Sequence, residues 1–286
     1  MTDYLDWHRD HRDPEVASCL DEVSLWSSRF GALLLDQVPI AHGMRVLDLA
    51  CGNGFPLYEL AHVLGTTSRL WGADIWREGL VRARSKQRLY ELPNVALAAA
   101  DGARLPFAAA SFDLVVSNLG VNNFEDPEAV LAECARVARL GGVLALTSNL
   151  EGHMAELYSV FRHVLEEIGN PVYFERLAAN EKHRGTREGL VAMLTAAGFT
   201  PSRAVGTSFT LRYADGSALL RHSLTRIGFL PGWKAVVDEP DRRRVFAALE
   251  HHLNHHAEHE GELQMTIPAL YLEAIRSWSG SRSREP

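Results

Sequence analysis

The sequence predicts an α/β fold with a doubly wound, mostly parallel sheet. Two observations carry this prediction. Short apolar segments alternate with helical patterns between residues 44 and 149, and a Gly-x-Gly turn stands between the first apolar segment and the helix after it. Strand, glycine-rich turn and helix in this order form a nucleotide-type site at the carboxyl end of a parallel strand. We therefore expect a ligand site at this edge of the sheet.

The expected elements follow one another in a regular order. The strands are Arg45–Ala50, Leu70–Asp74, Val95–Ala100, Phe112–Ser117 and Val143–Ser148, and the helices between them are Phe55–Leu64, Glu78–Leu89 and Glu128–Ala138. After Asn149 the alternation stops, and we expect helical segments at 151–182, 186–197 and 215–260, the last broken at Pro231-Gly232, with strands at 199–213 and 263–275.

The predicted domain organisation has three parts. Residues 1–43 form an N-terminal helical lid, residues 44–278 form the α/β domain, and residues 279–286 form a flexible tail. The segments near 151–182 and 215–260 are helical insertions in this domain, and we expect them to cover a substrate pocket.

The chemistry of the first turn indicates which nucleotide binds. Asp48 precedes Gly52 and Gly54, and a carboxylate at this edge would repel the pyrophosphate of a dinucleotide. The third small residue that a dinucleotide site needs is replaced by Leu57. A sulfonium and an ammonium group would instead be attracted by Asp48, which favours S-adenosylmethionine over NAD.

On these residues, the segment 44–149 resembles the core of the class I S-adenosylmethionine-dependent methyltransferases, and within them the group of the ubiquinone/menaquinone-biosynthesis enzymes. The resemblance implies a seven-stranded Rossmann-like sheet whose last strand is antiparallel. It also implies methyl transfer from S-adenosylmethionine to a small organic acceptor at O, N or C, with S-adenosylhomocysteine as product. The cofactor-binding residues that it implies are Asp48, Ala50, Gly52, Asn53, Gly54, Asp74, Ile75, Asp101, Gly102 and Asn118.

Within this set, Asp74 is expected to accept hydrogen bonds from the ribose hydroxyls, with Ile75 against the adenine. Asp101 is expected to accept a hydrogen bond from the adenine amino group. The residues expected to line the substrate pocket are Trp26, Asn122, Asn123 and Phe124. Many relatives have a histidine where Asn122 or Asn123 stands, so a general base is missing there. His153, just past the fifth strand, is the candidate catalytic residue.

Composition narrows the classes of function. The net charge of −7 argues against a nucleic-acid partner, and no apolar run is long enough to span a membrane. Cys19, Cys51 and Cys134 indicate no disulfide framework, and the polar N-terminus does not read as a signal peptide, so we expect a cytoplasmic protein. Both a monomer and a homodimer remain open.

The histidines between His251 and His259 are expected to form a solvated helix face. The sequence shows no further ligand outside that helix, so no metal is expected. Two alternatives to methyl transfer remain: a protein that binds S-adenosylmethionine without transferring methyl, and an NAD(P)-dependent oxidoreductase.

Overall fold

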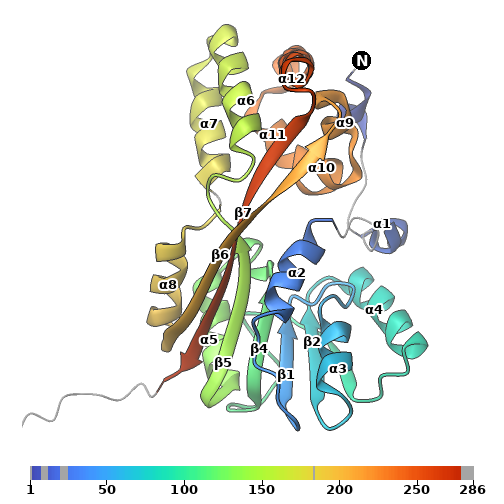
Figure 1. The fold of residues 1–286 in the computed structure, drawn as a ribbon, viewed down its shortest axis with the longest axis vertical. Coiled ribbons are helices and arrows are strands. Elements are labelled where there is room, and N and C mark those ends of the chain that lie inside the picture. Colours follow the sequence, from blue (N-terminus) through green and yellow to red (C-terminus); the bar gives the residue numbers. More distant parts are fainter. Residues whose placement is uncertain (1, 8–11, 20–24, 183, 278–286) are drawn as a thin grey trace, which may run out of the picture. The chain divides into compact units, whose positions relative to one another are not determined.

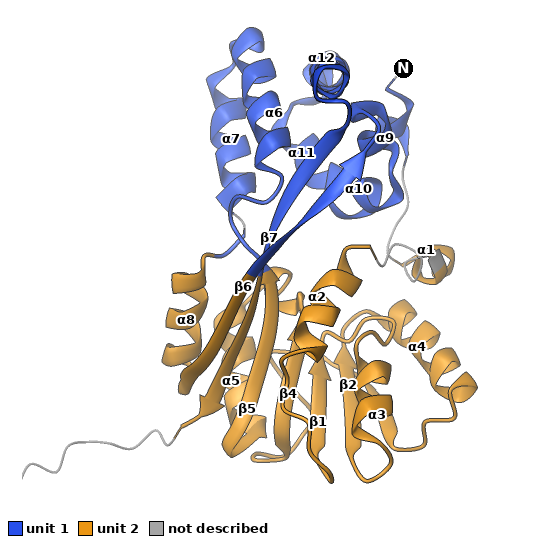
Figure 2. Ribbon diagram, viewed as in Figure 1, with its two compact units in different colours: residues 1–9, 149–185, 207–269 blue, residues 10–148, 186–206, 270–286 orange. Residues whose placement is uncertain are grey.

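The structure is a computed structural model that describes residues 2–7, 12–19, 25–182 and 184–277. The chain divides into two compact units (Figure 2). Unit 1 comprises Met1–Arg9, Asn149–Gly185 and Thr207–Ala269, and unit 2 comprises Asp10–Ser148, Thr186–Gly206 and Leu270–Pro286. Both segments predicted as helical insertions thus fall in unit 1, with the first residues of the chain. The predicted flexible tail, residues 279–286, lies outside the described residues.

The chain forms a seven-stranded sheet with the strand order β3-β2-β1-β4-β5-β7-β6 (Figure 1). The strands are β1 (Arg45–Leu49), β2 (Arg69–Asp74), β3 (Val95–Ala99), β4 (Phe112–Asn118), β5 (Ala138–Asn149), β6 (Phe199–Tyr213) and β7 (Leu263–Arg276). The five strands β1 to β5 pair in parallel. Strand β6 begins in unit 2 and ends in unit 1, whereas its neighbour β7 begins in unit 1 and ends in unit 2, so these two strands are antiparallel. The predicted fold class is confirmed.

The helices of unit 2 follow the predicted alternation closely. They are α1 (Pro14–Cys19), α2 (Ser27–Leu35), α3 (Leu57–Leu64), α4 (Arg77–Leu89), α5 (Pro127–Val137) and α8 (Arg187–Ala196), with the short 3-10 helix η2 (Gly120–Asn122). The carboxylate of Asp126 accepts a hydrogen bond from the Ala129 amide at 3.0 Å, and Thr186 caps α8 in the same way. These side chains satisfy amides that a helix leaves free at its first turn.

Strand β1 is an interior strand, and its residues show why. Val46, Leu47 and Leu49 are almost completely buried, as expected for a strand with neighbours on both edges and helices on both faces. Val46 belongs to a core cluster with Leu57, Leu60 and residues of β2 and β4. The strand therefore holds the turn that follows it in a rigid setting.

Strand β5 begins earlier than the sequence predicts. The pattern indicates a strand from Val143, but pairing starts at Ala138 opposite Phe112 and resumes at Val143 opposite Leu114. The register shift between these pairs accommodates Gly141 and Gly142, which lie between the predicted helix and the predicted strand. A bulge within the strand, not a loop before it, explains the two glycines.

Unit 1 is built mainly from helices. They are the 3-10 helix η1 (Asp3–Asp6), α6 (Ala155–Ile168), α7 (Pro171–Lys182), α9 (Gly216–Arg221), α10 (Ser223–Gly228), α11 (Leu230–Val236) and α12 (Glu239–Glu260). Helix α12 packs against α6 and α9, with the rings of Phe161 and Phe246 5.8 Å apart. No helix in the described part of the chain is long and apolar enough to cross a membrane.

The predicted break at Pro231-Gly232 is wrong. Pro231 lies in the first turn of α11, where a proline costs no hydrogen bond because that amide has no partner within the helix. The helical segment is interrupted instead at His222, at Phe229 and at Val237–Asp238, where backbone angles leave the helical region.

Candidate active site

The turn after β1 is an open backbone surface in unit 2. The amides of Ala50 and Cys51 both donate to the Ala73 carbonyl oxygen of β2, at 2.8 and 3.3 Å. Gly52 has φ +54°, and a Cβ atom there would meet no atom within 4 Å. Gly54 has φ +102°, and a Cβ atom there would lie 2.1 Å from the Tyr58 ring. Gly52 therefore leaves room for a ligand, whereas Gly54 lets α3 pack closely; Asn53 lies between them.

Asp74, at the end of β2, holds this turn in place. Its Oδ2 accepts a hydrogen bond from the Gly52 amide at 2.7 Å, and its Oδ1 accepts one from the Trp76 amide at 2.7 Å. Burial raises the pKa of the Asp74 carboxyl group, and these two amides counteract the increase. The side chain of the next residue, Ile75, is 73% exposed.

Asp48 lies deeper than the sequence argument assumes. Its side chain is completely buried, and neither carboxylate oxygen has a hydrogen-bond partner among the described residues. Burial raises the pKa of this carboxyl group well above its ordinary value, and the neighbouring Asp74 raises it further. Asp48 is therefore not an exposed carboxylate at the lip of the turn but a buried one beneath it.

The loop after β3 carries the next predicted pair. Asp101 is exposed, and its Oδ1 accepts a hydrogen bond from the Ala103 amide at 2.9 Å, which shapes the turn. A Cβ atom on Gly102 would lie 3.3 Å from the side chain of Val130 in α5, so the loop backbone packs closely on that helix. Asp101 keeps its second oxygen for another donor.

The end of β4 is joined to its neighbours by side-chain hydrogen bonds. Asn118 donates through Nδ2 to the Ser27 carbonyl oxygen of α2 at 3.1 Å, and its Oδ1 accepts from the Thr147 hydroxyl of β5 at 2.6 Å. Asn122 accepts from the Ser148 hydroxyl at 2.8 Å. Thr147 and Ser148 are not among the predicted site residues, although polar residues at the end of an otherwise apolar strand could have indicated them.

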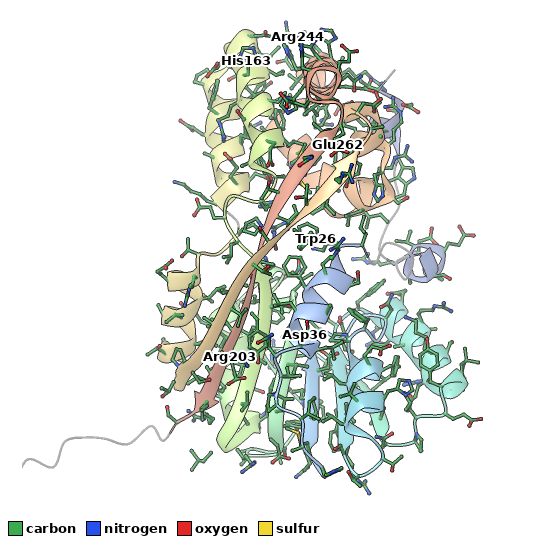
Figure 3. All side chains as sticks on the ribbon, viewed as in Figure 1. Trp26, Asp36, His163, Arg203, Arg244 and Glu262 are labelled. Atoms are coloured by element: carbon green, nitrogen blue, oxygen red, sulfur yellow. The ribbon has the colours of Figure 1, made fainter. Side chains whose placement is uncertain are left out.

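The remaining residues predicted for the substrate pocket lie near this strand end in different settings. Asn123 is exposed and donates to the Leu119 carbonyl oxygen at 3.3 Å, and Phe124 is half-buried. Trp26 directly precedes α2 (Figure 3), and its ring centroid is 5.3 Å from that of Phe30. The structure thus distributes the predicted residues of unit 2 over the carboxyl ends of β1, β2, β3 and β4.

Comparison with known proteins identifies the family of the chain. Residues 40–183 match the family model of a methyltransferase domain. Over 250 residues the chain is 31% identical to nocamycin O-methyltransferase of Saccharothrix syringae, covering 84% of this chain and 88% of the relative. The chain belongs to the class I S-adenosylmethionine-dependent methyltransferases.

Two further likenesses accompany this family. The methyltransferase is 30% identical over 175 residues to the ubiquinone/menaquinone biosynthesis C-methyltransferase UbiE of Klebsiella pneumoniae subsp. pneumoniae, over 58% of this chain and 70% of the relative. It superimposes on the crystal structure of YcgJ from Bacillus subtilis with a TM-score of 0.58 and 17% identity, over 88% of this chain and 100% of the other. The predicted resemblance is confirmed, and the NAD(P)-dependent oxidoreductase and the non-transferring protein are set aside.

The polar groups of unit 2 fit S-adenosylmethionine. The partly buried Asp74 carboxylate keeps a lone pair on each oxygen for the ribose hydroxyls, and the exposed Ile75 offers an apolar face for adenine. The partnerless carboxylate of Asp48 suits a cation, which the methionine portion of the cofactor carries. Asn118 uses one N–H group and one lone pair of its side-chain amide in these bonds, so its second N–H group and its backbone are the parts left for the cofactor.

His153, the predicted catalytic residue, belongs to unit 1 of the methyltransferase. Its side chain is 2% exposed, and Nδ1 and Nε2 have no hydrogen-bond partner in the described part of the chain. Burial, together with the positive charge of Arg184, lowers the pKa of His153 to about 4. The imidazole is therefore neutral at physiological pH, and it is a weak base.

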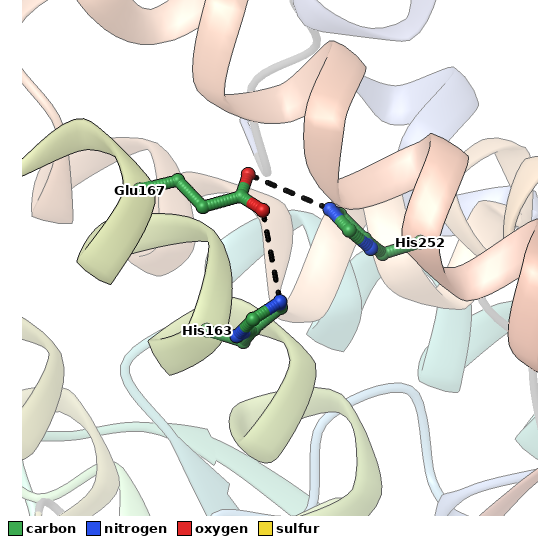
Figure 4. A group of neighbouring side chains, drawn as sticks. All are labelled: His163, Glu167 and His252. Carbon is green, nitrogen blue, oxygen red and sulfur yellow. Dashed lines mark ion pairs between the residues drawn. The ribbon is translucent and has the colours of Figure 1, made fainter.

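The histidine-rich helix α12 has a neighbour that the sequence did not reveal. His252 Nε2 lies 3.5 Å from Glu167 Oε2, and His163 Nε2, on α6 like Glu167, lies 3.6 Å from Glu167 Oε1 (Figure 4). The expectation that no further ligand lies outside α12 is wrong, because α6 packs against α12 and brings His163 and Glu167 to His252. All three side chains are partly or largely exposed, and the two imidazoles form ion pairs with Glu167 when protonated. Further along α12, the Nε2 atoms of His255 and His259 are 3.1 Å apart.

Proposed function

We propose that this methyltransferase transfers the methyl group to an oxygen atom of a small organic acceptor. The supporting observation is the extent of the likeness to nocamycin O-methyltransferase, which covers 84% of the chain. The likeness to the C-methyltransferase UbiE covers 58%. Similarity that reaches well beyond the cofactor-binding core favours oxygen over carbon as the acceptor atom.

In this proposal unit 2 binds the cofactor through Asp48, Ala50, Gly52, Asn53, Gly54, Asp74, Ile75, Asp101, Gly102 and Asn118. Trp26, Asn122, Asn123 and Phe124 contact the acceptor. What supports the proposal is that the described carboxylates at the strand ends of unit 2 suit a cationic, ribose-containing ligand.

Methyl transfer needs little chemical assistance from the protein. S-adenosylmethionine supplies a methyl carbon that its sulfonium already activates. The new O–C bond forms while the C–S bond breaks, and the electron pair of that bond stays on sulfur. The residues of this chain have to hold the acceptor oxygen in line and exclude water. With its lowered pKa, His153 holds no proton on its second nitrogen at neutral pH and serves as a hydrogen-bond donor or as a weak proton acceptor.

The experiment is a methyl-transfer assay with methyl-labelled S-adenosylmethionine and a panel of acceptors. The panel pairs carboxylic acids, phenols and acidic enols with amines and with carbon nucleophiles of similar size. We expect label in ethers or esters, identified by mass spectrometry. Label only in C-methyl or N-methyl products would contradict oxygen as the acceptor atom. A cytoplasmic location and a homodimer stay predictions, which cell fractionation and light scattering test.

A further inference from the structure

The turn before α6 is fixed firmly in unit 1. The Leu150 amide donates to the Pro268 carbonyl oxygen at 3.2 Å, and the Met154 amide donates to the Thr266 carbonyl oxygen at 2.8 Å. Met154 has φ +51°, a left-handed conformation that non-glycine residues adopt only when their surroundings enforce it. His153 stands in this turn, so its ring position is set by the fold and is not adjustable by a mobile loop.

Arg184 is brought to the same turn from the end of α7. The Glu151 amide donates to the Gly185 carbonyl oxygen at 3.1 Å, which joins the two segments. The guanidinium of Arg184 is partly buried, and its Nε has no hydrogen-bond partner among the described residues. Burial lowers the pKa of Arg184, and the hydroxyl of Tyr158 counteracts this. In the part of the chain that the structure describes, Arg184 forms no ion pair.

Aromatic side chains surround these two polar groups. The ring centroid of His153 is 5.6 Å from that of Tyr158 and 6.2 Å from that of Phe229, and Phe229 stacks on Trp233 at 5.9 Å. The Tyr158 hydroxyl is already engaged, since it accepts from Trp233 Nε1 at 3.2 Å and donates to Asn180 Oδ1 at 2.9 Å. The aromatic groups therefore provide apolar contact, and the unused hydrogen-bonding capacity is on His153 and Arg184.

A partly buried guanidinium without a carboxylate partner is energetically costly, and so is a buried imidazole with two unsatisfied nitrogens. An oxyanion would pair with Arg184, which donates and carries the compensating charge, and would accept from the one N–H group of neutral His153. We propose that Arg184 and His153 form a binding site in unit 1 for an anionic group of a small-molecule ligand, a carboxylate or an ionised acidic hydroxyl. His153 is then a hydrogen-bond donor to this group, and Arg184 supplies the positive charge.

The test uses matched pairs of probes that differ in charge. Binding of benzoate and benzamide, and of 4-nitrophenolate and 4-nitroanisole, is measured by calorimetry at pH 8 with the full-length protein saturated with S-adenosylhomocysteine. We expect the anion of at least one pair to bind at least about 10-fold more tightly than its neutral partner. The pair that shows the preference distinguishes a carboxylate from an ionised hydroxyl.

Variants locate the site. Arg184→Gln is expected to weaken binding of the anion about 10-fold or more and binding of the neutral probe less than about 2-fold. Arg184→Lys is expected to recover part of the lost affinity. His153→Gln is expected to weaken binding of the anion by a smaller factor than Arg184→Gln. Arg162→Gln is the control, because Arg162 lies on the neighbouring α6 but is exposed and already paired with Glu181 at 2.5 Å.

The outcomes separate the two proposals. Equal binding of charged and neutral probes, no binding of either anion, or the same loss in the Arg162 variant as in the Arg184 variant would overturn the anion site. A preserved charge preference in a protein that places label only on carbon or nitrogen would leave the anion site standing while the O-methyl proposal fails. Thermal melting of each variant shows whether it is folded, and Arg184→Lys serves as the readout if Arg184→Gln is not.

Discussion

Each unit buries a titratable side chain that has no hydrogen-bond partner in the described residues, but the two side chains have opposite character. Unit 2 buries Asp48, and unit 1 buries His153 with the cationic Arg184 nearby. Burial shifts the pKa of both groups toward their neutral forms. The charged ligand that would relieve Asp48 is a cation, whereas the one that would relieve Arg184 and His153 is an anion. The difference teaches that burial in the two units favours ligand groups of opposite charge.

The strongest test of the cofactor site proposed in unit 2 is the substitution Asp74→Ala. The substitution removes both oxygens that hold the Gly52 and Trp76 amides and that face the ribose in the proposed site. Loss of two hydrogen bonds to a charged group, each contributing about 1.5–3 kcal/mol, predicts at least a 100-fold weaker binding of S-adenosylhomocysteine by calorimetry. Asp74→Asn, which keeps one acceptor oxygen, should lose less. Unchanged affinity in both Asp74→Ala and Asp101→Ala would contradict the cofactor assignment.

The strongest test of the buried, neutral His153 in unit 1 is the pH dependence of the protein's stability. His153 has a pKa of about 4 in the folded protein and an ordinary value of 6.5 when unfolded. The unfolded chain therefore binds more protons between these values, so the stability contribution is fully present above about pH 6.5 and is lost as the pH falls toward 4. Over this pH range the contribution of His153 to the free energy of unfolding falls by about 3 kcal/mol.

Urea unfolding of the wild type and of His153→Gln, measured from pH 4 to pH 8, checks this. The difference in unfolding free energy between the two proteins should change by about 3 kcal/mol across the window. His163→Gln is the matched control, because His163 lies on α6 with an exposed side chain. Parallel curves for the wild type and His153→Gln would show that His153 is not buried in the neutral form.

The sequence predicts the two units unequally well. The strands and turns of unit 2 follow from local rules: a buried apolar run at β1, a proline and an aspartate at the start of α5, and a carboxylate at the end of β2. The same rules miss the bulge in β5, since the register depends on pairing with β4. They also place Asp48 at the edge of the turn, because the burial of its side chain depends on how the strands and α3 pack in the folded protein.

The side-chain contacts of unit 1 could not be predicted from local sequence patterns. Arg184 approaches His153 only because the Glu151 amide bonds to the Gly185 carbonyl oxygen across the whole α6–α7 hairpin. His163 and Glu167 meet His252 only because α6 packs against α12. Neither contact has a local pattern, because the residues that meet are far apart in sequence.

A third test concerns Asp48 and has the opposite pH dependence to that of His153. The folded pKa of Asp48 is raised, so its stability contribution is present at acid pH and is lost as the pH rises through the folded pKa. Asp48→Asn removes the buried charge, and the cofactor-free variant should be about 1–3 kcal/mol more stable than the wild type at pH 8. The advantage should shrink toward pH 5.

The same variant shows which charge of the cofactor Asp48 favours. If Asp48 acts on the sulfonium, the Asp48→Asn variant should lose more affinity for S-adenosylmethionine than for S-adenosylhomocysteine, because only S-adenosylmethionine carries the sulfonium charge. A carboxylate that acts on the ammonium should lose both equally. Calorimetry with the two ligands separates these cases, and no loss for either would show that Asp48 has a structural role only.

The smallest expected effect concerns the exposed group of His163, Glu167 and His252. If the group is only a charge network, removal of divalent metal with EDTA leaves the methyl-transfer rate within about 2-fold, and His252→Ala lowers the unfolding free energy by less than about 1 kcal/mol because solvent screens exposed ion pairs. His256→Ala, one turn further along α12, is the matched control. A large drop in rate with EDTA that added Zn²⁺ restores in the wild type but not in His252→Ala would show that unit 1 carries a metal centre, and the comparison of the two units would then need a third charged site.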